Sequence, residues 1–89
     1  AADEDMLRRA TTEQARDILG DLKPKERAVI CRRFGIPEDG SDGEREPMTL
    51  QEIGAELKLS RERVRQIEAQ ALQRLRRGGK TRRLMSVLR

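Results

Sequence analysis

The sequence lacks most of the residues on which enzymatic and metal chemistry depends. Its 89 residues include no histidine, tryptophan or tyrosine, one phenylalanine and one cysteine, Cys31. Without histidine, neither a histidine-based catalytic triad nor a dedicated zinc site is available. A single cysteine excludes an internal disulfide and is compatible with a reducing compartment. We therefore expect a domain that is not an enzyme and has no metal, no other cofactor and no small-molecule substrate.

Long apolar runs are also missing. No stretch approaches the roughly 20 apolar residues that a transmembrane helix needs, and the acidic start, AADEDM, does not resemble a signal peptide. These absences predict a cytoplasmic protein that does not contact a membrane. A chain of this length buries only about 60–65% of its unfolded surface, which predicts one modest core of aliphatic side chains.

What the sequence has in abundance is charge, and the positive charge is concentrated at one end. Residues 1–59 carry 10 basic and 14 acidic side chains, whereas residues 60–89 carry 10 basic and two acidic ones. Nine of those last ten cations are arginine, which suits bidentate contacts with phosphate and with guanine. This distribution is typical of nucleic-acid binding. A solvated, salt-bridged helix face would give the same pattern.

The apolar spacing predicts an all-α fold, because no stretch alternates strictly enough to form a strand. A first helix begins at Thr11 or Thr12, with Thr11 as its N-cap, and ends at Gly20. A second helix begins near Pro24 and stops at Gly35.

The segment 37–47, PEDGSDGEREP, predicts an exposed and mobile loop. It contains two prolines and two glycines and is rich in acidic residues, so we expect nothing in it to be buried.

The sequence after this loop predicts a helix-turn-helix motif. Residues 49–52, TLQE, form a capping box that opens a short helix with Leu50, Ile53 and Leu57 facing inward. After a turn at Lys58-Leu59, Ser60 caps a second helix that ends at Gly78-Gly79. Its apolar stripe consists of Val64, Ile67, Ala71 and Leu75. Two such helices joined by about three residues define the motif, and the overall prediction is a small helical domain.

The first turns of this second helix carry the residue types that read base edges. In a helix-turn-helix, these turns enter the major groove. Arg61, Glu62, Arg65 and Gln66 lie there, away from the apolar stripe. Arginine pairs with guanine, glutamine with adenine, and glutamate with the amino group of cytosine. A solubilising face of i, i+4 pairs is the alternative interpretation.

These residues also carry a family resemblance. Residues 49–76, TLQEIGAELKLSRERVRQIEAQALQRLR, closely resemble region 4.2 of the sigma-70 family, the promoter-recognition subunits of bacterial RNA polymerase. Residues 22–36, LKPKERAVICRRFGI, resemble region 4.1, with Arg33-Phe34-Gly35 as the most telling tripeptide. The resemblance implies a primary-type or primary-like sigma factor represented by its C-terminal domain, and the start without methionine suggests a fragment of a longer chain.

The domain plan follows from the resemblance. Residues 1–10 form a tail or a helix extension, and residues 11–89 form the DNA-binding domain. Within it, region 4.1 covers about 11–36, the acidic loop 37–47, the helix-turn-helix 49–77 and a C-terminal segment 80–89.

The resemblance also implies partners and roles. It implies that Arg61, Glu62, Arg65 and Gln66 read the minus-35 element of double-stranded promoter DNA. It implies backbone contacts for Lys25, Arg33, Thr49, Leu50, Gln51, Ser60 and Arg63. It implies docking on the beta flap of the RNA polymerase core through an apolar surface, for which the candidates are Phe34, Ile36, Leu75, Leu84 and Leu88. Ordinary core packing is the alternative for each of those five.

Two alternative functions remain open at this stage. The domain could serve mainly as a protein-interaction module for the flap, an anti-sigma factor or an activator, with little DNA affinity of its own. It could also be an unrelated helix-turn-helix regulator, although the RERVRQIE core argues against this. Gln70 and Gln73 stand where many housekeeping members have basic residues, which puts activator contacts in doubt. Cys31 is interpreted as a small buried hydrophobe rather than a redox switch.

Overall fold

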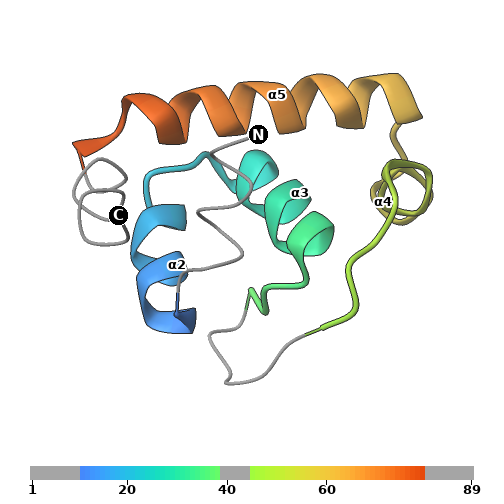
Figure 1. The fold of residues 1–89 in the computed structure, drawn as a ribbon. Helices are drawn as coiled ribbons and strands as arrows, with labels where there is room; N and C mark the ends of the chain where they lie inside the picture. Colours follow the sequence, from blue (N-terminus) through green and yellow to red (C-terminus); the bar gives the residue numbers. More distant parts are fainter. Residues whose placement is uncertain (1–10, 39–44, 80–89) are drawn as a thin grey trace.

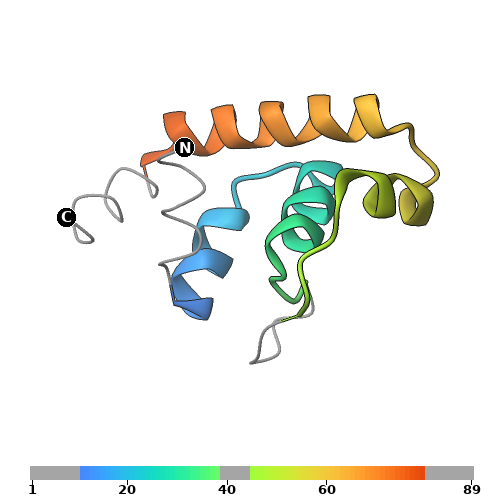
Figure 2. The ribbon, with the colours of Figure 1, turned by 45° about the vertical axis from the view of Figure 1, so that its right-hand side comes forward.

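The computed structural model describes residues 11–38 and 45–79, which form four helices. These are α2 (Thr12–Leu19), α3 (Pro24–Phe34), α4 (Leu50–Leu57) and α5 (Arg61–Arg77). Neither of the two ranges contains a strand, so the all-α prediction is confirmed there. The long helix α5 lies across one side of the molecule, over the three shorter helices (Figure 1). Its start lies beside α4 and its end beside α2 in both views (Figure 2).

The helix starts follow the capping signals of the sequence. At α2, the Oγ1 of Thr11 accepts the N–H of Gln14 at 3.2 Å, and the Gln14 side chain accepts the N–H of Thr11 at 3.0 Å. Thr49 and Glu52 make the same reciprocal pair at α4, at 3.1 and 2.9 Å. Each box provides partners for backbone N–H groups that the first helical turn leaves without one. The two predicted capping boxes are confirmed.

The helix ends are also where glycine predicts them. Gly20, Gly35 and Gly78 are the C-caps of α2, α3 and α5, and α3 begins at Pro24. Proline fits the first helical position because the N–H that it lacks would have no intrahelical partner there.

The two ends of the segment 37–47 pack more closely than the sequence predicts. Pro37 is buried, so the expectation that nothing in this segment is buried was wrong. The N–H of Arg45 donates to the carbonyl oxygen of Gly35 at 2.9 Å, which fixes the returning chain against the end of α3. Gly35 has a φ of +72°, and a Cβ there would collide with the Arg45 carbonyl oxygen. Only glycine suits that approach. Residues 39–44 lie outside the described residues.

Two adjoining apolar clusters form the core, and α3 and α5 contribute to both. The first cluster joins α2 to the end of α5 and contains Ile18, Leu19, Leu22, Ile30, Cys31, Ala71 and Leu75. The second joins α4 to the start of α5 and contains Val29, Ile53, Val64 and Ile67. The predicted stripe of α5 is confirmed, because its four apolar side chains are all 2% exposed or less. No helix in the described ranges has the length and apolar character needed to cross a membrane.

Candidate nucleic-acid interface

Helices α4 and α5 form the predicted helix-turn-helix. Lys58 ends α4 in the left-handed conformation, with a φ of 60°, and its N–H donates to the carbonyl oxygen of Gly54. The Leu59 N–H donates to the same oxygen at 2.8 Å. A Cβ on Gly54 would lie 2.5 Å from the Leu59 carbonyl oxygen, so the turn needs glycine at this position. Ser60 then caps α5, its Oγ accepting the N–H of Arg63 at 3.0 Å.

The four residues predicted to read bases are all exposed at the start of α5. Arg61, Glu62, Arg65 and Gln66 lie in its first two turns. The buried side chains of the same turns, Val64 at 0% and Ile67 at 2% exposure, face the core. The structure therefore brings the four polar side chains together on an accessible face.

Glu62 and Arg65 form an ion pair within this face. The Nε of Arg65 donates to both carboxylate oxygens of Glu62 at 3.0 Å. The hydrogen bond from Arg65 holds the pKa of the Glu62 carboxyl below its ordinary value, and the same bond raises the pKa of Arg65. Both side chains are more than half exposed, so the pair is weak in water. A base edge can therefore displace either partner at little cost.

The predicted backbone contacts lie in different environments. Lys25 is exposed in the first turn of α3, and Arg63 is exposed in the first turn of α5. At the start of α4, Thr49 and Gln51 are exposed and Leu50 is half-buried. This helix start presents backbone N–H groups and the positive end of the helix dipole, which favour an anion.

Arg33 differs from the other backbone candidates, because it is already engaged within the domain. Its Nε donates to the Oε2 of Glu68 at 3.0 Å, and its Nη1 donates to the carbonyl oxygen of Met48 at 3.2 Å. The Glu68 side chain is only 13% exposed. Arg33 therefore joins α3 to α5 and to the segment that precedes α4.

The predicted docking residues divide into three groups. Leu75 is 1% exposed within the first core cluster, so it cannot contribute to a surface, and its assignment as a docking residue was wrong. Phe34 and Ile36 are half-buried and pack on the same cluster. Leu84 and Leu88, with the whole segment 80–89, lie outside the described residues, as do residues 1–10.

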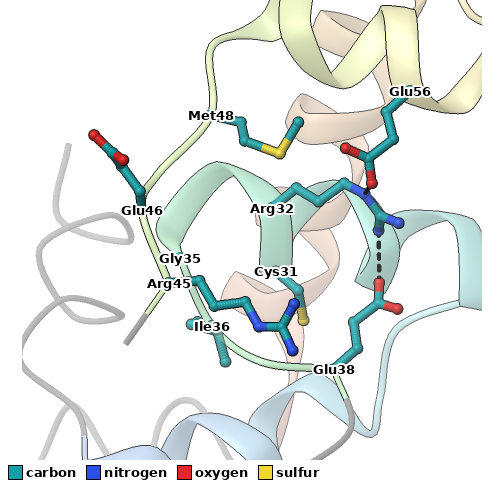
Figure 3. A pocket seen from close by; sticks show the side chains of 9 residues that line it. All are labelled: Cys31, Arg32, Gly35, Ile36, Glu38, Arg45, Glu46, Met48 and Glu56. Atoms are coloured by element: carbon teal, nitrogen blue, oxygen red, sulfur yellow. Dashed lines mark hydrogen bonds and ion pairs between the residues drawn. The ribbon is translucent and has the colours of Figure 1, made fainter. Parts of the chain in front are cut away.

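A pocket of about 370 Å³ lies beside Ile36 and is shown in Figure 3. Across it, Arg32 forms two ion pairs, with Glu38 from its Nη1 and with Glu56 from its Nε, both at 2.9 Å (Figure 3). Cys31 also lines the pocket but is 3% exposed, and burial raises the pKa of its thiol to about 11. The thiol is therefore protonated at neutral pH, in agreement with its interpretation as a small hydrophobe.

One contact between α3 and α5 has no signal in the local sequence. Glu26 is 5% exposed and accepts hydrogen bonds from the Nε and Nη2 of Arg74, at 2.8 and 3.4 Å. It also accepts the N–H of Lys23 at 3.1 Å. The pair connects the first turn of α3 to α5 across 48 residues of sequence. In the described part of the chain, no group of three or more acidic or cysteine side chains could hold a metal ion.

Comparison with known proteins gives a consistent result. The model of the family "Sigma-70, region 4" matches residues 18–77. The chain is 49% identical over 74 residues to the probable RNA polymerase sigma-C factor of Synechocystis sp., covering 83% of this chain and 17% of that protein. It is 45% identical over 71 residues to the RNA polymerase sigma factor RpoD of Helicobacter pylori, covering 80% of this chain and 10% of that protein.

A third relative is the RNA polymerase sigma factor SigA of Clostridium acetobutylicum, which is 41% identical over 80 residues, or 90% of this chain and 20% of that protein. The chain thus spans a fifth or less of the length of these three relatives. No solved structure matches it significantly.

Proposed function

Because the chain belongs to the sigma-70 region 4 family, we propose that it recognises the minus-35 promoter element as part of an RNA polymerase sigma factor in transcription initiation. The domain plan drawn from the sequence is part of this proposal, with regions 4.1 and 4.2 on either side of the segment 37–47. The relatives are named as sigma factors, which are not enzymes.

The observation that carries the proposal is the exposed polar face at the start of α5. In a helix-turn-helix, the second helix places its first turns in the major groove. Arg61, Glu62, Arg65 and Gln66 are the side chains available there. Arginine reads guanine and glutamine reads adenine by paired hydrogen bonds. In the free domain, Arg65 forms an exposed ion pair with Glu62 on this face.

Backbone contacts orient the helix in the groove. The start of α4, with Thr49, Leu50 and Gln51, approaches one phosphate through its free N–H groups. Lys25 and Arg63 supply charge on the neighbouring side, and the backbone beside the Ser60 cap lies close to the DNA. Arg33 donates hydrogen bonds to Glu68 and Met48. It therefore contacts a phosphate only through the N–H groups that these two bonds do not use.

Docking on the beta flap of polymerase completes the proposal. In the described chain, Phe34 and Ile36 are the apolar candidates for that surface, and Leu84 and Leu88 of the segment 80–89 are the others. The second candidate function is a protein-interaction module that binds the flap, an anti-sigma factor or an activator and has little DNA affinity alone. The half-buried apolar side chains beside the pocket of Figure 3 favour such an additional contact.

Base-pair discrimination tests the proposed role. Arg65→Ala and Gln66→Ala should each lose about 1–3 kcal/mol of preference at one base pair of the element. Arg76→Ala is a matched control, because it removes an exposed arginine from the same side of α5, three turns and about 16 Å further along the helix.

The assay compares fluorescence anisotropy on a minus-35 duplex with that on duplexes carrying each single substitution. If Arg65→Ala and Gln66→Ala keep the wild-type ratios of affinity, the major-groove assignment is wrong. If the wild-type chain has no preference and binds DNA only weakly, the protein-interaction function replaces it.

A further inference from the structure

Arg32, in the last turn of α3, contacts the chain at both ends of α4. Its side chain crosses the pocket of Figure 3, and its Nε donates to the Oε1 of Glu56, in the last turn of α4, at 2.9 Å. Its backbone carbonyl oxygen accepts the N–H of Met48 at 3.0 Å, directly before Thr49, the N-cap of α4. One residue of α3 therefore holds α4 on both sides of its middle.

Apolar packing alone determines the direction of α4 only weakly. Of residues 50–57, all of which the structure describes, only Ile53 has a fully buried side chain, and it lies near the middle of the helix. Leu50 and Leu57 pack against the same core cluster but are half-buried. Because the hydrophobic effect is not directional, a helix anchored by one central side chain can tilt about it. Hydrogen bonds at its two ends are directional and oppose such a tilt.

The guanidinium of Arg32 is itself fixed by several acceptors. Its Nη1 donates to the carbonyl oxygen of Ala28 at 3.1 Å and to the Oε1 of Glu38 at 2.9 Å. With Glu56, these acceptors come from α3, from the segment after α3 and from α4. The Arg32 side chain is 24% exposed, so water screens its ion pairs less than those of a fully exposed arginine. The group can therefore transmit the position of α3 to α4.

A small tilt of α4 would disturb both parts of the helix-turn-helix. The helix is about 12 Å long, so a rotation of about 10° about its middle moves each end by about 1 Å. A shift of that size breaks an N–H···O hydrogen bond of about 2.9 Å. The other end of α4 continues into α5 through a tight turn, in which the N–H groups of Lys58 and Leu59 both donate to the Gly54 carbonyl oxygen. The direction of α4 therefore affects its own start and the start of α5.

We propose that Arg32 and Glu56 are positioning residues for DNA recognition. Their ion pair sets the direction of α4, so that the start of α4 and the start of α5 contact one duplex at the same time. This inference rests on the proposed function. Neither side chain contacts DNA in this arrangement, and both act through α4. Functional groups need support to within about 0.5 Å, and the two end contacts of α4 supply it.

The charge of Glu56 gives the inference a test by sign. A carboxylate near a polyanion weakens binding through its charge, so Glu56→Gln should strengthen DNA binding if charge alone matters. If the carboxylate orients α4, the same substitution should weaken binding. Glu46→Gln is the matched control. Glu46 is exposed and lines the same pocket, and it forms no ion pair within residues 11–38 and 45–79.

Two measurements are made on the 89-residue chain and on the variants Glu56→Gln, Arg32→Gln, their double variant and Glu46→Gln. Fluorescence anisotropy at one salt concentration gives the affinity for a minus-35 duplex. Residual dipolar couplings of the backbone N–H groups give the orientation of α4 relative to α3 and α5 without DNA. Thermal melts identify a temperature at which every variant is folded, so that a loss of stability does not count as a loss of binding.

Glu56→Gln should bind the minus-35 duplex about two- to fivefold more weakly, the range that corresponds to an ion pair of this exposure. Its dipolar couplings in α4 should differ from those of the wild-type chain. The double variant should bind no more weakly than Arg32→Gln, because the two side chains act as a pair. Glu46→Gln should keep the wild-type couplings and bind as well as the wild-type chain or slightly better.

The outcomes distinguish this inference from the proposed function. Unchanged couplings of α4 in Glu56→Gln overturn the positioning role, whatever the affinity, and leave recognition of the minus-35 element intact. Unchanged or stronger binding by Glu56→Gln, in a chain that prefers the minus-35 duplex, overturns it as well. If the wild-type chain has no sequence preference, the proposed function fails. The couplings then decide alone whether the pair orients α4.

Discussion

Removing the guanidinium of Arg74 should destabilise the domain more than removing any exposed charge. Arg74→Met keeps the aliphatic stem but leaves the carboxylate of Glu26, which is 5% exposed, without its cation. At an effective dielectric constant of 20, two charges 4 Å apart attract by about 4 kcal/mol. The Arg74 side chain is 42% exposed, so solvent screening reduces this to about 2 kcal/mol. We expect Arg74→Met to cost about 2–3 kcal/mol, because a buried charge also loses hydrogen bonds.

A second substitution, Glu26→Gln, tests this prediction, because its effect on stability should change sign with the residue at position 74. Glu26→Gln in the wild-type background should destabilise the domain, because the pair is lost. The same substitution in the Arg74→Met background should stabilise it, because an amide is less costly to bury alone than a charge. The glutamine oxygen can still accept the N–H of Lys23, so the start of α3 keeps its cap.

Urea denaturation followed by far-UV circular dichroism measures these differences. The chain has no tryptophan or tyrosine, so intrinsic fluorescence is not a useful probe. With a slope of about 1 kcal/mol/M, a loss of 2 kcal/mol moves the midpoint by about 2 M urea. Arg65→Met, which breaks an exposed pair, is the control and should leave the midpoint unchanged. If Glu26→Gln costs the same in both backgrounds, the two side chains are not coupled and the reasoning is refuted.

Three further predictions concern the N-terminal cap of α4, the turn after α4 and the core. Glu52→Gln should remove a pH dependence of the free energy of unfolding. The backbone N–H and side chain of Thr49 hold the pKa of Glu52 below its ordinary value, so the stabilisation by its carboxylate is present above about pH 4.5 and is lost as the pH falls through the folded pKa. An NMR titration of the Glu52 carboxyl in the wild-type chain measures that pKa. Gly54→Ala should destabilise the fold by about 1–3 kcal/mol in the same urea assay, because its Cβ would lie 2.5 Å from the Leu59 carbonyl oxygen; an unchanged midpoint would show that the turn can move aside. Cys31, with its pKa raised to about 11, should react with a disulfide reagent at pH 8 only as fast as the domain opens, and fast labelling of the folded chain would contradict its burial.

Local signals in the sequence predict the helices well, because they act within one or two turns. Thr49 and Glu52 are three residues apart, and their capping box forms as the spacing indicates. The apolar stripe that includes Val64 and Leu75 is buried as its period requires. The family resemblance also rests on contiguous residues, and the match over residues 18–77 confirms it.

Local signals do not predict contacts between residues that are distant in the sequence. Arg33 pairs with Glu68 across 35 residues, and Glu26 pairs with Arg74 across 48. In a chain with 40% charged residues, many such pairs are possible, and only the packing of α3 against α5 selects these two. The misassignment of Leu75 has another origin: its spacing on α5 placed it in the buried stripe, and only the family resemblance suggested a docking role.

Under the proposed function, the division of α5 into a buried stripe and an exposed polar face has a consequence for how base recognition can change. Neither core cluster contains Arg61, Glu62, Arg65 or Gln66. Surface substitutions away from packing and caps usually change stability by no more than about 0.5 kcal/mol. A lineage can therefore exchange these four side chains, alone or together, without losing the fold on the way. If these four side chains read bases as proposed, new recognition can arise by substitutions on this face, while the residues beneath it keep the helix in place.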